Sequence, residues 1–322
     1  QEEVIGSHPS STNTVPSAND AGGPSLFHEP PLALSCLEIF GGNGAIDTTV
    51  AVPGLDVWVY SRPHQSERGG DVHYISACGA GNIARILLAD VAGHGAEVEQ
   101  LARTLRDSVR RNIETLDTRR LARSLNDAFA EWEAHGRFAT AIVATFFAPT
   151  NQLILVNAGH PRPIRLGHDS TNWRTVDAHD PQNSRSRGPR NLPLGVIEDI
   201  DYEQFAVDFA PGDMMLLVTD AVVEAKNDRG EMLGESGLIE LLDSFAGTPP
   251  KGLVEGLVGA VEQRRAGAMI DDDLTVLLIR RNADPVRRLS LADQTRVWLR
   301  RFGMVADAPT MVSHEHLRRL AE

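Results

Sequence analysis

A series of short apolar runs joined by tight turns is the feature that most constrains how this chain can fold. Runs rich in Val, Ile, Leu and Ala are candidate strands at residues 56–60, 72–78, 83–89, 140–147, 153–157, 163–166, 205–209, 214–219 and 274–280. Residues 79–82 (GAGN) connect two of these strands, and residues 149–151 (PTN) connect two more. Because a parallel crossover needs roughly a dozen residues or more, the connected strands are expected to be antiparallel.

Apolar residues at helical spacing interrupt the strand series. They recur through residues 98–113 and 121–132, and shorter patterns at 238–242 and 253–261 predict two further helices. Strand pairs, then a helical pair, then strands again indicate sheets that pack together with helices on the outside. The expected fold class is therefore α+β.

Changes in composition divide the chain into three predicted parts. Residues 1–31 are rich in Ser, Pro, Asn and Gly, and are expected to be a disordered lead. Residues 32–282 are patterned throughout and are expected to form one domain, with a long polar surface loop at 167–191. Residues 283–322 are expected to form a basic, helical tail, because the segment 281–322 contains eight Arg and five acidic residues.

Charge and cysteine content exclude several classes of protein. The 31 basic and 44 acidic residues give a net charge of −13, which speaks against a nucleic-acid-binding surface. The longest apolar runs are far shorter than the roughly 20 residues that a membrane span requires. Cys36 and Cys78 cannot form a disulfide framework, and no signal peptide is recognisable, so a cytoplasmic location is expected. These features leave the oligomeric state open.

Four acidic signatures lie beside predicted strand ends. They are RGGD with Asp71, ADVAGHG with Asp90, TDAVVE with Asp220 and DDDLT with the run 271–273. Carboxylates at strand ends can converge, and each pair ~4 Å apart costs about 4 kcal/mol at an effective dielectric constant near 20. Such a cluster is tolerable only with bound cations, and oxygen-only ligands favour Mg²⁺ or Mn²⁺. The alternative for each Asp taken singly is a turn residue, an N-cap or a solvated loop end.

Seven signatures in order carry a resemblance to a known family. GGD, ADVAGHG, RFATAIVATFF, NAGHPRP, LPLG, TDAVVEA and DDDLTVLLI, over about residues 36–282, resemble the bacterial stage-II-sporulation-E-like branch of the metal-dependent (type 2C) Ser/Thr protein phosphatases. The resemblance implies an α-β-β-α sandwich of two antiparallel sheets with a binuclear metal site at one end. It also implies a phosphorylated protein as substrate, such as the anti-sigma-factor antagonist of a partner-switching pathway.

The same resemblance implies roles for individual residues. Asp90 and the backbone carbonyl of Val91 match the bridging ligand, and Asp71, Asp220 and Asp272 match the remaining carboxylates. Asp272 is preferred within its run because it precedes Thr275 by three places, so Asp271 and Asp273 are expected not to be ligands. Two Mn²⁺ or Mg²⁺ ions would neutralise a phosphate ester and activate water, so hydrolysis needs no covalent intermediate.

Other residues remain open between a direct and a supporting role. Arg68 and His94 are candidates for contact with the substrate phosphate, with a surface arginine and a residue that fixes the start of a helix as the alternatives. His160 is expected to be structural or substrate-facing, and Glu224 to support the ligands. Ala221, where the family usually has Gly, and His73, where Tyr is common, motivate one alternative function: an inactive pseudophosphatase that acts as a binding module.

Overall fold

The computed structural model describes residues 36–64, 66–78, 82–93, 95–130, 137–177, 191–264 and 272–284. All of these belong to one unit, Leu34–Glu322. The predicted lead at 1–31 and the tail from residue 285 onward lie outside the described residues, as do His94 and Asp271. No helix in the described ranges is both long and apolar enough to cross a lipid bilayer.

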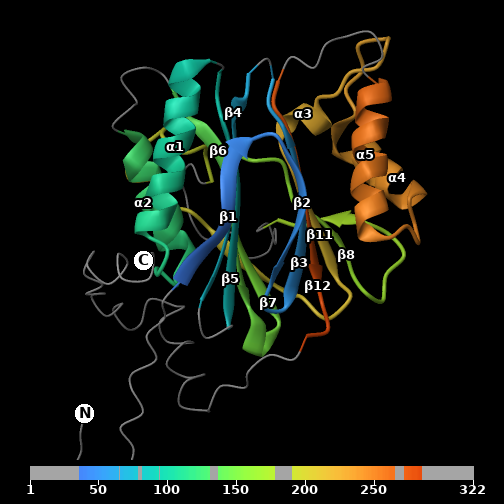
Figure 1. The fold of residues 1–322 in the computed structure, drawn as a ribbon, viewed down its shortest axis with the longest axis horizontal. Helices are drawn as coiled ribbons and strands as arrows, with labels where there is room; N and C mark the ends of the chain where they lie inside the picture. The colour runs from blue at the N-terminus through green and yellow to red at the C-terminus, as the bar shows by residue number, and fades with distance from the viewer. Residues whose placement is uncertain are drawn as a thin grey trace, which may run out of the picture. The chain divides into compact units, whose positions relative to one another are not determined.

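Two antiparallel sheets, each of six strands within the described part of the chain, stack face to face (Figure 1). The first sheet has the order β1 (Cys36–Gly44), β4 (Arg68–Cys78), β5 (Ile83–Val91), β6 (Ala139–Phe147), β7 (Gln152–Ala158) and β10 (Gln204–Asp208). The second has the order β2 (Ile46–Val52), β3 (Leu55–Arg62), β12 (Leu274–Arg281), β11 (Met214–Val218), β8 (Ile164–Leu166) and β9 (Arg174–Thr175).

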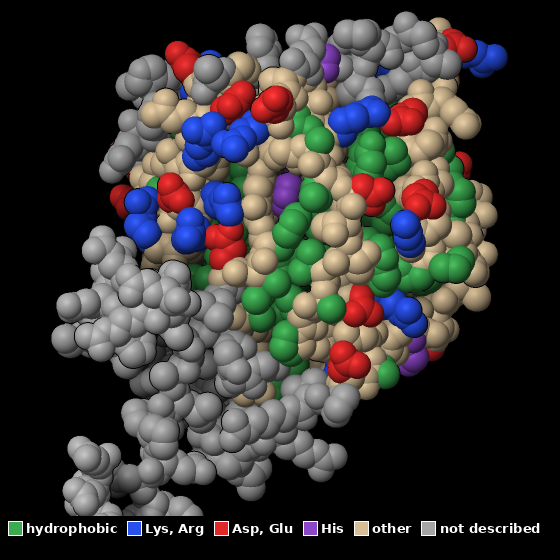
Figure 2. All heavy atoms as spheres, in the orientation of Figure 1, with side chains coloured by type: hydrophobic (Ala, Val, Ile, Leu, Met, Phe, Trp, Pro, Cys, Tyr) green, Lys and Arg blue, Asp and Glu red, His purple; other side chains and the backbone are tan. Residues whose placement is uncertain are grey.

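Helices cover the outer face of each sheet, which confirms the predicted α-β-β-α layers. The helices α1 (Ala96–Arg111) and α2 (Thr118–Ala130) pack on the first sheet, and α3 (Asp220–Val223), α4 (Gly234–Ser244) and α5 (Pro250–Arg264) lie on the side of the second (Figure 1). On the face drawn in Figure 2, Lys and Arg side chains gather over the region of α1, interspersed with acidic ones.

Three apolar layers hold the sandwich together, and their alternation fixes where the acidic residues point. On β4, Val72 and Tyr74 pack toward the helices, whereas Ile75 packs between the sheets. On β5, Leu87 packs toward the helices and Leu88 between the sheets. Because side chains alternate along a strand, Asp71 and Asp90 share the inter-sheet side of their strands. Both faces of these strands are buried, and the strands therefore have continuous apolar sequences.

The first two strands and one short strand were not predicted. The strands β1 and β2 contain GGNG and polar threonines, so they lack the dense apolar pattern of the other strands. β4 begins at Arg68, and Asp71 therefore lies within the strand rather than before it. The predicted loop at 167–191 is wrong in part, because Arg174–Thr175 pairs with β8 and Trp173 is buried. Residues 178–190 of that loop lie outside the described residues.

A buried aspartate fixes the start of β11 at the end away from Asp220. Asp213 is fully buried and accepts hydrogen bonds from His168 N (2.6 Å), His168 Nδ1 (2.8 Å), Arg165 Nη2 (2.6 Å) and Ala210 N (3.0 Å). Burial opposes the ionisation of Asp213, but these donors outweigh it and hold the pKa of the carboxyl below its usual value. Asp213 thereby ties the segment after β8 to β11.

Asp213→Asn is expected to lower the free energy of unfolding by about 2 kcal/mol at pH 7, because it removes a charged acceptor from Arg165. A depressed pKa contributes stability above the unfolded-state pKa, and that stability is lost as the pH falls through the folded-state pKa. The difference between parent and variant should therefore shrink toward pH 3 in urea denaturation. Asp208→Asn, on the exposed end of β10, is the control. An equal loss of unfolding free energy at pH 7 and pH 3 would contradict the lowered pKa of Asp213.

Candidate functional site

Strand register brings the predicted acidic residues to one end of the sandwich. Val72 lies opposite Ala89 between β4 and β5, so Asp71 and Asp90 are the next residues along these strands. Val218 lies opposite Val276 between β11 and β12, and Thr219 N donates to Thr275 O at 3.1 Å just beyond that pair. Asp220 and Asp272 therefore follow and precede their strands at the same end of the second sheet.

Hydroxyl groups from the second sheet hold the carboxylate of Asp71. The side chain of Asp71 is 2% exposed, and Thr219 Oγ1 donates to its Oδ2 at 3.0 Å. The Thr275 hydroxyl also lies close enough to favour the ionised form, and Ser61 Oγ lies 2.9 Å from Thr275 Oγ1. Among the described residues, no group makes a hydrogen bond of normal geometry to Asp71 Oδ1. One buried oxygen of Asp71 is thus left for another partner.

The carboxylates are close enough to perturb one another. Burial, and then the charge of Asp90, raise the pKa of Asp71 well above its usual range. Burial, followed by the charges of Asp220 and Asp272, raises the pKa of Asp90 to about 8, and Glu224 adds to this effect. Burial is also the largest cause of the raised pKa of Asp272. These acids therefore resist ionisation together unless positive charge lies between them.

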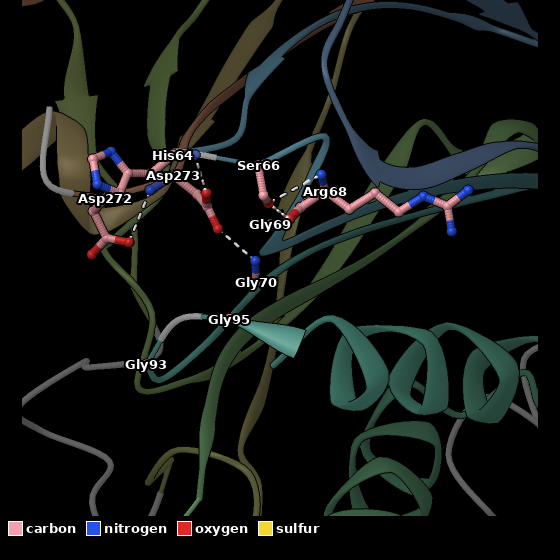
Figure 3. A pocket seen from close by; sticks show the side chains of 9 residues that line it. All are labelled: His64, Ser66, Arg68, Gly69, Gly70, Gly93, Gly95, Asp272 and Asp273. Carbon is pink, nitrogen blue, oxygen red and sulfur yellow. Dashed lines mark hydrogen bonds between the residues drawn. The ribbon is translucent and has the colours of Figure 1, made fainter. Parts of the chain in front are cut away.

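Asp273, which was not expected to be a ligand, anchors the backbone that carries Asp71. Its buried carboxylate accepts hydrogen bonds from the backbone N–H groups of Gly70 and His64, and a longer one from Asp71 N at 3.4 Å (Figure 3). A Cβ at Gly69 would overlap this carboxylate, so the GGD glycines permit the close approach. The sequence signal that could have identified Asp273 is this pair of glycines before an aspartate.

A hollow of about 140 Å³ opens over these residues. Its lining includes His64, Arg68, Gly93, Asp272 and Asp273. The Val91 carbonyl oxygen lies next to Gly70, which lines this hollow, since a Cβ added at Gly70 would come within 2.8 Å of it. The hollow is therefore bordered by hard oxygen donors, which suit Mg²⁺ or Mn²⁺.

The residues present fit a divalent cation, although their side chains do not already enclose one. Within the described residues, no three Asp, Glu, His or Cys side chains gather tightly enough to form a complete metal site. Two observations favour a cation here: the unpartnered Asp71 Oδ1 and the mutual repulsion of the buried acids. The side chains that could hold it are Asp71, Asp90, Asp220 and Asp272, with the Val91 carbonyl.

Two other predicted site residues, Arg68 and His160, lie apart from the carboxylate cluster. The exposed side chain of Arg68 extends away from Asp272 and Asp273, along the side on which α1 runs (Figure 3). His160 is buried, and its Nδ1 lies 2.9 Å from Thr140 Oγ1, on the residue opposite Asp90 in the β5–β6 register. Burial lowers the pKa of His160 to about 3 against the opposing effect of a backbone hydrogen bond with Val218, so this imidazole is neutral at pH 7.

The two departures from the family pattern do not distort the site. Ala221 lies in the short helix α3 and is buried in the apolar layer, and its φ angle is not positive. Its extra methyl group therefore meets no left-handed backbone. His73 is buried and stacks on Phe40 with ring centroids 5.3 Å apart. Neither residue supplies an observation in favour of a pseudophosphatase.

Comparisons with known proteins match this architecture. The family model described as Stage II sporulation protein E (SpoIIE) matches residues 81–282. The chain is 22% identical over 228 residues to the phosphoserine phosphatase RsbU of Bacillus subtilis (strain 168), covering 70% of this chain and 63% of that relative. It is 23% identical over 199 residues to the phosphoserine phosphatase RsbP of the same organism, covering 60% of this chain and 45% of RsbP. The chain thus spans less than two thirds of each relative.

Solved structures share the fold. The SiaA-PP2C domain of Pseudomonas aeruginosa superposes with a TM-score of 0.58 at 18% identity, covering 70% of this chain and 85% of that one. The structure of the PP2C phosphatase domain and a regulatory-domain fragment of SpoIIE from Bacillus subtilis gives a TM-score of 0.56 at 16% identity, covering 77% and 65%. At these identities the likeness establishes the sandwich of two antiparallel sheets flanked by helices.

Without metal, the thermal stability of the protein is expected to fall as the pH rises from about 5 to 8. The unfolded chain releases the Asp90 proton near its ordinary pKa, whereas the folded chain keeps it up to about pH 8. Asp90→Asn should flatten this dependence and raise the midpoint in EDTA at pH 8 by about 2–4 °C. Differential scanning fluorimetry with exposed Asp47→Asn as the control tests this. A pH-independent midpoint in the parent would show that the acids are not clustered.

Asp273→Ala is expected to lower the free energy of unfolding by about 2–3 kcal/mol, because the Gly70 and His64 N–H groups lose their acceptor. The neighbouring Asp272→Ala should change it by less than about 0.5 kcal/mol in EDTA, since Asp272 is exposed. Urea denaturation of both variants tests the difference. Equal effects of the two substitutions would refute an anchoring role for Asp273.

Proposed function

Because the chain belongs to the Stage II sporulation protein E (SpoIIE) family, we propose that it hydrolyses phosphoserine or phosphothreonine esters on a protein with the help of divalent cations. The single observation that carries the proposal is the convergence of the buried Asp71, the partly buried Asp90 and Asp220 and the exposed Asp272 on one mutually repelling cluster. RsbU and RsbP, which are named phosphoserine phosphatases, support the reaction class. The proposed catalytic domain is residues 32–282.

The proposed cofactor is a pair of Mg²⁺ or Mn²⁺ ions. Four carboxylates carry four negative charges, which two divalent cations balance. A solved structure of RsbX in complex with magnesium supports a divalent metal for this fold. When bound, such ions neutralise charge on a phosphate ester and make water acidic enough to attack at neutral pH.

The chain's own residues would orient the ligands and the substrate. Thr219 and Thr275 fix the carboxylate plane of Asp71, and Asp273 fixes the backbone from which Asp71 projects. Asp90 and the Val91 carbonyl would contribute from the end of β5, and Asp272 from the segment before β12. This preorganisation means that little reorganisation is needed when a charged ester binds.

The attacking group is proposed to be water rather than a side chain. Cys78 lies at the far end of β4 from Asp71, seven residues away. At about 3.3 Å per strand residue, the backbone positions of Asp71 and Cys78 are roughly 23 Å apart. Cys36 lies opposite Cys78 and is equally remote. Neither cysteine could form a phosphoenzyme at the carboxylate cluster, so direct hydrolysis is the mechanism that these residues support.

The proposed substrate is a phosphorylated signalling protein in the cytoplasm. RsbU and RsbP support a partner-switching context, in which the substrate would be a phosphorylated anti-sigma-factor antagonist. The hollow opens to the surface and Asp272 in its lining is exposed, so a phosphorylated side chain of another protein could reach it.

The purified protein is expected to hydrolyse p-nitrophenyl phosphate and a phosphoserine peptide with Mn²⁺ or Mg²⁺ and to lose activity in EDTA. Asp90→Asn and Asp220→Asn should each lower kcat/KM by about 100-fold or more, since each removes a charge from the cluster. Asp208→Asn should retain parental activity. A parent inactive across both metals and pH 6–9 would refute the enzyme assignment, and full activity in both variants would refute the residue assignment.

A further inference from the structure

A second hollow of about 430 Å³ lies beside the carboxylate cluster. Glycines of β1, residues of β4 and one face of α1 line it, including Gly41, Gly42, Gly44, Arg68, Arg103 and Arg106. We call it the arginine groove. None of its residues belongs to the predicted metal ligands, and the sequence analysis assigned no role to the GGNG segment of β1.

The arginine groove adjoins the hollow of the candidate metal site at Arg68. Arg68 lines both hollows, and its side chain extends away from Asp272 and Asp273 (Figure 3). Gly44 lies opposite Arg68 in the β1–β4 register, and Asn43 Nδ2 donates to Gly69 O at 3.0 Å. The wall of the groove is therefore bonded directly to the GGD segment that carries Asp71.

The backbone of β1 is accessible in the groove. β1 is the edge strand of its sheet in the described structure, so one side of its backbone has no partner strand there. A Cβ added at Gly42 would meet nothing closer than His73 Nε2 at 3.5 Å. The backbone at Gly42 is therefore not tightly packed against its neighbours. Edge strands with exposed N–H and C=O groups bind extended peptides in many recognition domains.

The charge of the groove opposes that of the whole chain. Three arginines and one aspartate, Asp107, line it, on a protein with a net charge of −13. Arg103 is 57% exposed, and its one ion pair among the described residues is a long contact of 3.6 Å to Glu99 within the same helix. Arg106 pairs with Glu38, and no carboxylate among the described residues pairs with Arg68. On the face drawn in Figure 2, basic side chains lie over the region of α1 together with acidic ones.

We propose that the arginine groove binds an acidic segment flanking the phosphorylated residue of the protein substrate. The inference rests on the proposed function and specifies its substrate class. The phosphorylated residue would occupy the metal site, and the acidic flank would run along β1 and α1 and contact Arg68 and Arg103, since Glu38 already holds Arg106. Guanidinium groups bind carboxylates through paired N–H donors, which gives this surface its selectivity for Asp and Glu.

The experiment compares two fluorescent phosphoserine peptides that differ only in replacing flanking Asp and Glu by Asn and Gln. Fluorescence anisotropy in EDTA measures binding without turnover, and kcat/KM is measured with Mn²⁺. The parent should prefer the acidic peptide by about fivefold in Kd, and high salt should reduce this preference. Arg103→Gln should lower the preference to less than about twofold.

Arg123→Gln is the matched control. Arg123 lies on α2, away from the groove, is similarly exposed (53%) and pairs with Asp201. It should keep the parental preference. Equal binding of both peptides by the parent, or equal effects of the two arginine substitutions, would overturn the proposal.

Hydrolysis of p-nitrophenyl phosphate by the parent tests the proposed phosphatase function separately from the proposed binding of an acidic flank. An inactive parent that still prefers the acidic peptide would refute the proposed enzyme function and support the groove. An active parent without that preference would support the proposed enzyme function and refute the proposed role of the groove.

Discussion

Repulsion between carboxylates that have been withdrawn from water is the constraint on which the rest of this structure depends. Asp71 and Asp90 lie between two sheets, where burial and their neighbours raise both pKa values. Such an arrangement persists only if its backbone is held rigidly and its oxygens find partners. Thr219 donates a hydrogen bond to the Asp71 carboxylate, Asp273 holds the backbone before it by accepting from Gly70 N, and the three apolar layers of the sandwich supply the rigidity.

The sandwich is suited to this task because antiparallel neighbours present opposite chain ends at the same edge. The start of β4 and the end of β5 meet in one sheet, and the end of β11 and the start of β12 meet in the other. Central strands buried on both faces cannot shift register without exposing apolar side chains. The positions of the acids are therefore fixed by the whole core rather than by local contacts around the hollow.

Much of the fold and of the candidate site could be predicted from the sequence, and the errors have physical causes. Buried central strands have dense Val, Leu and Ile runs, which made β5, β6 and β12 recognisable. β1 is an edge strand rich in glycine, so its pairing with β4 follows from tertiary context rather than from its own propensity. Asp273 was expected not to be a ligand, but its anchoring role was not predicted, because its hydrogen-bond partner Gly70 lies 203 positions away in the sequence.

The sequence by itself determined the chemical inventory: which acids precede or follow strands, which faces of the helices are apolar, and that the ordered signatures are those of one family. Only the tertiary structure decided how the adjacent Asp272 and Asp273 divide their roles. Asp272 is exposed to the hollow, whereas Asp273 turns inward to the Gly70 backbone. Both residues precede β12, so no strand periodicity sets their directions. Hydrogen bonds to the Gly70 and His64 backbone, which the packing of the two sheets brings close, turn Asp273 inward.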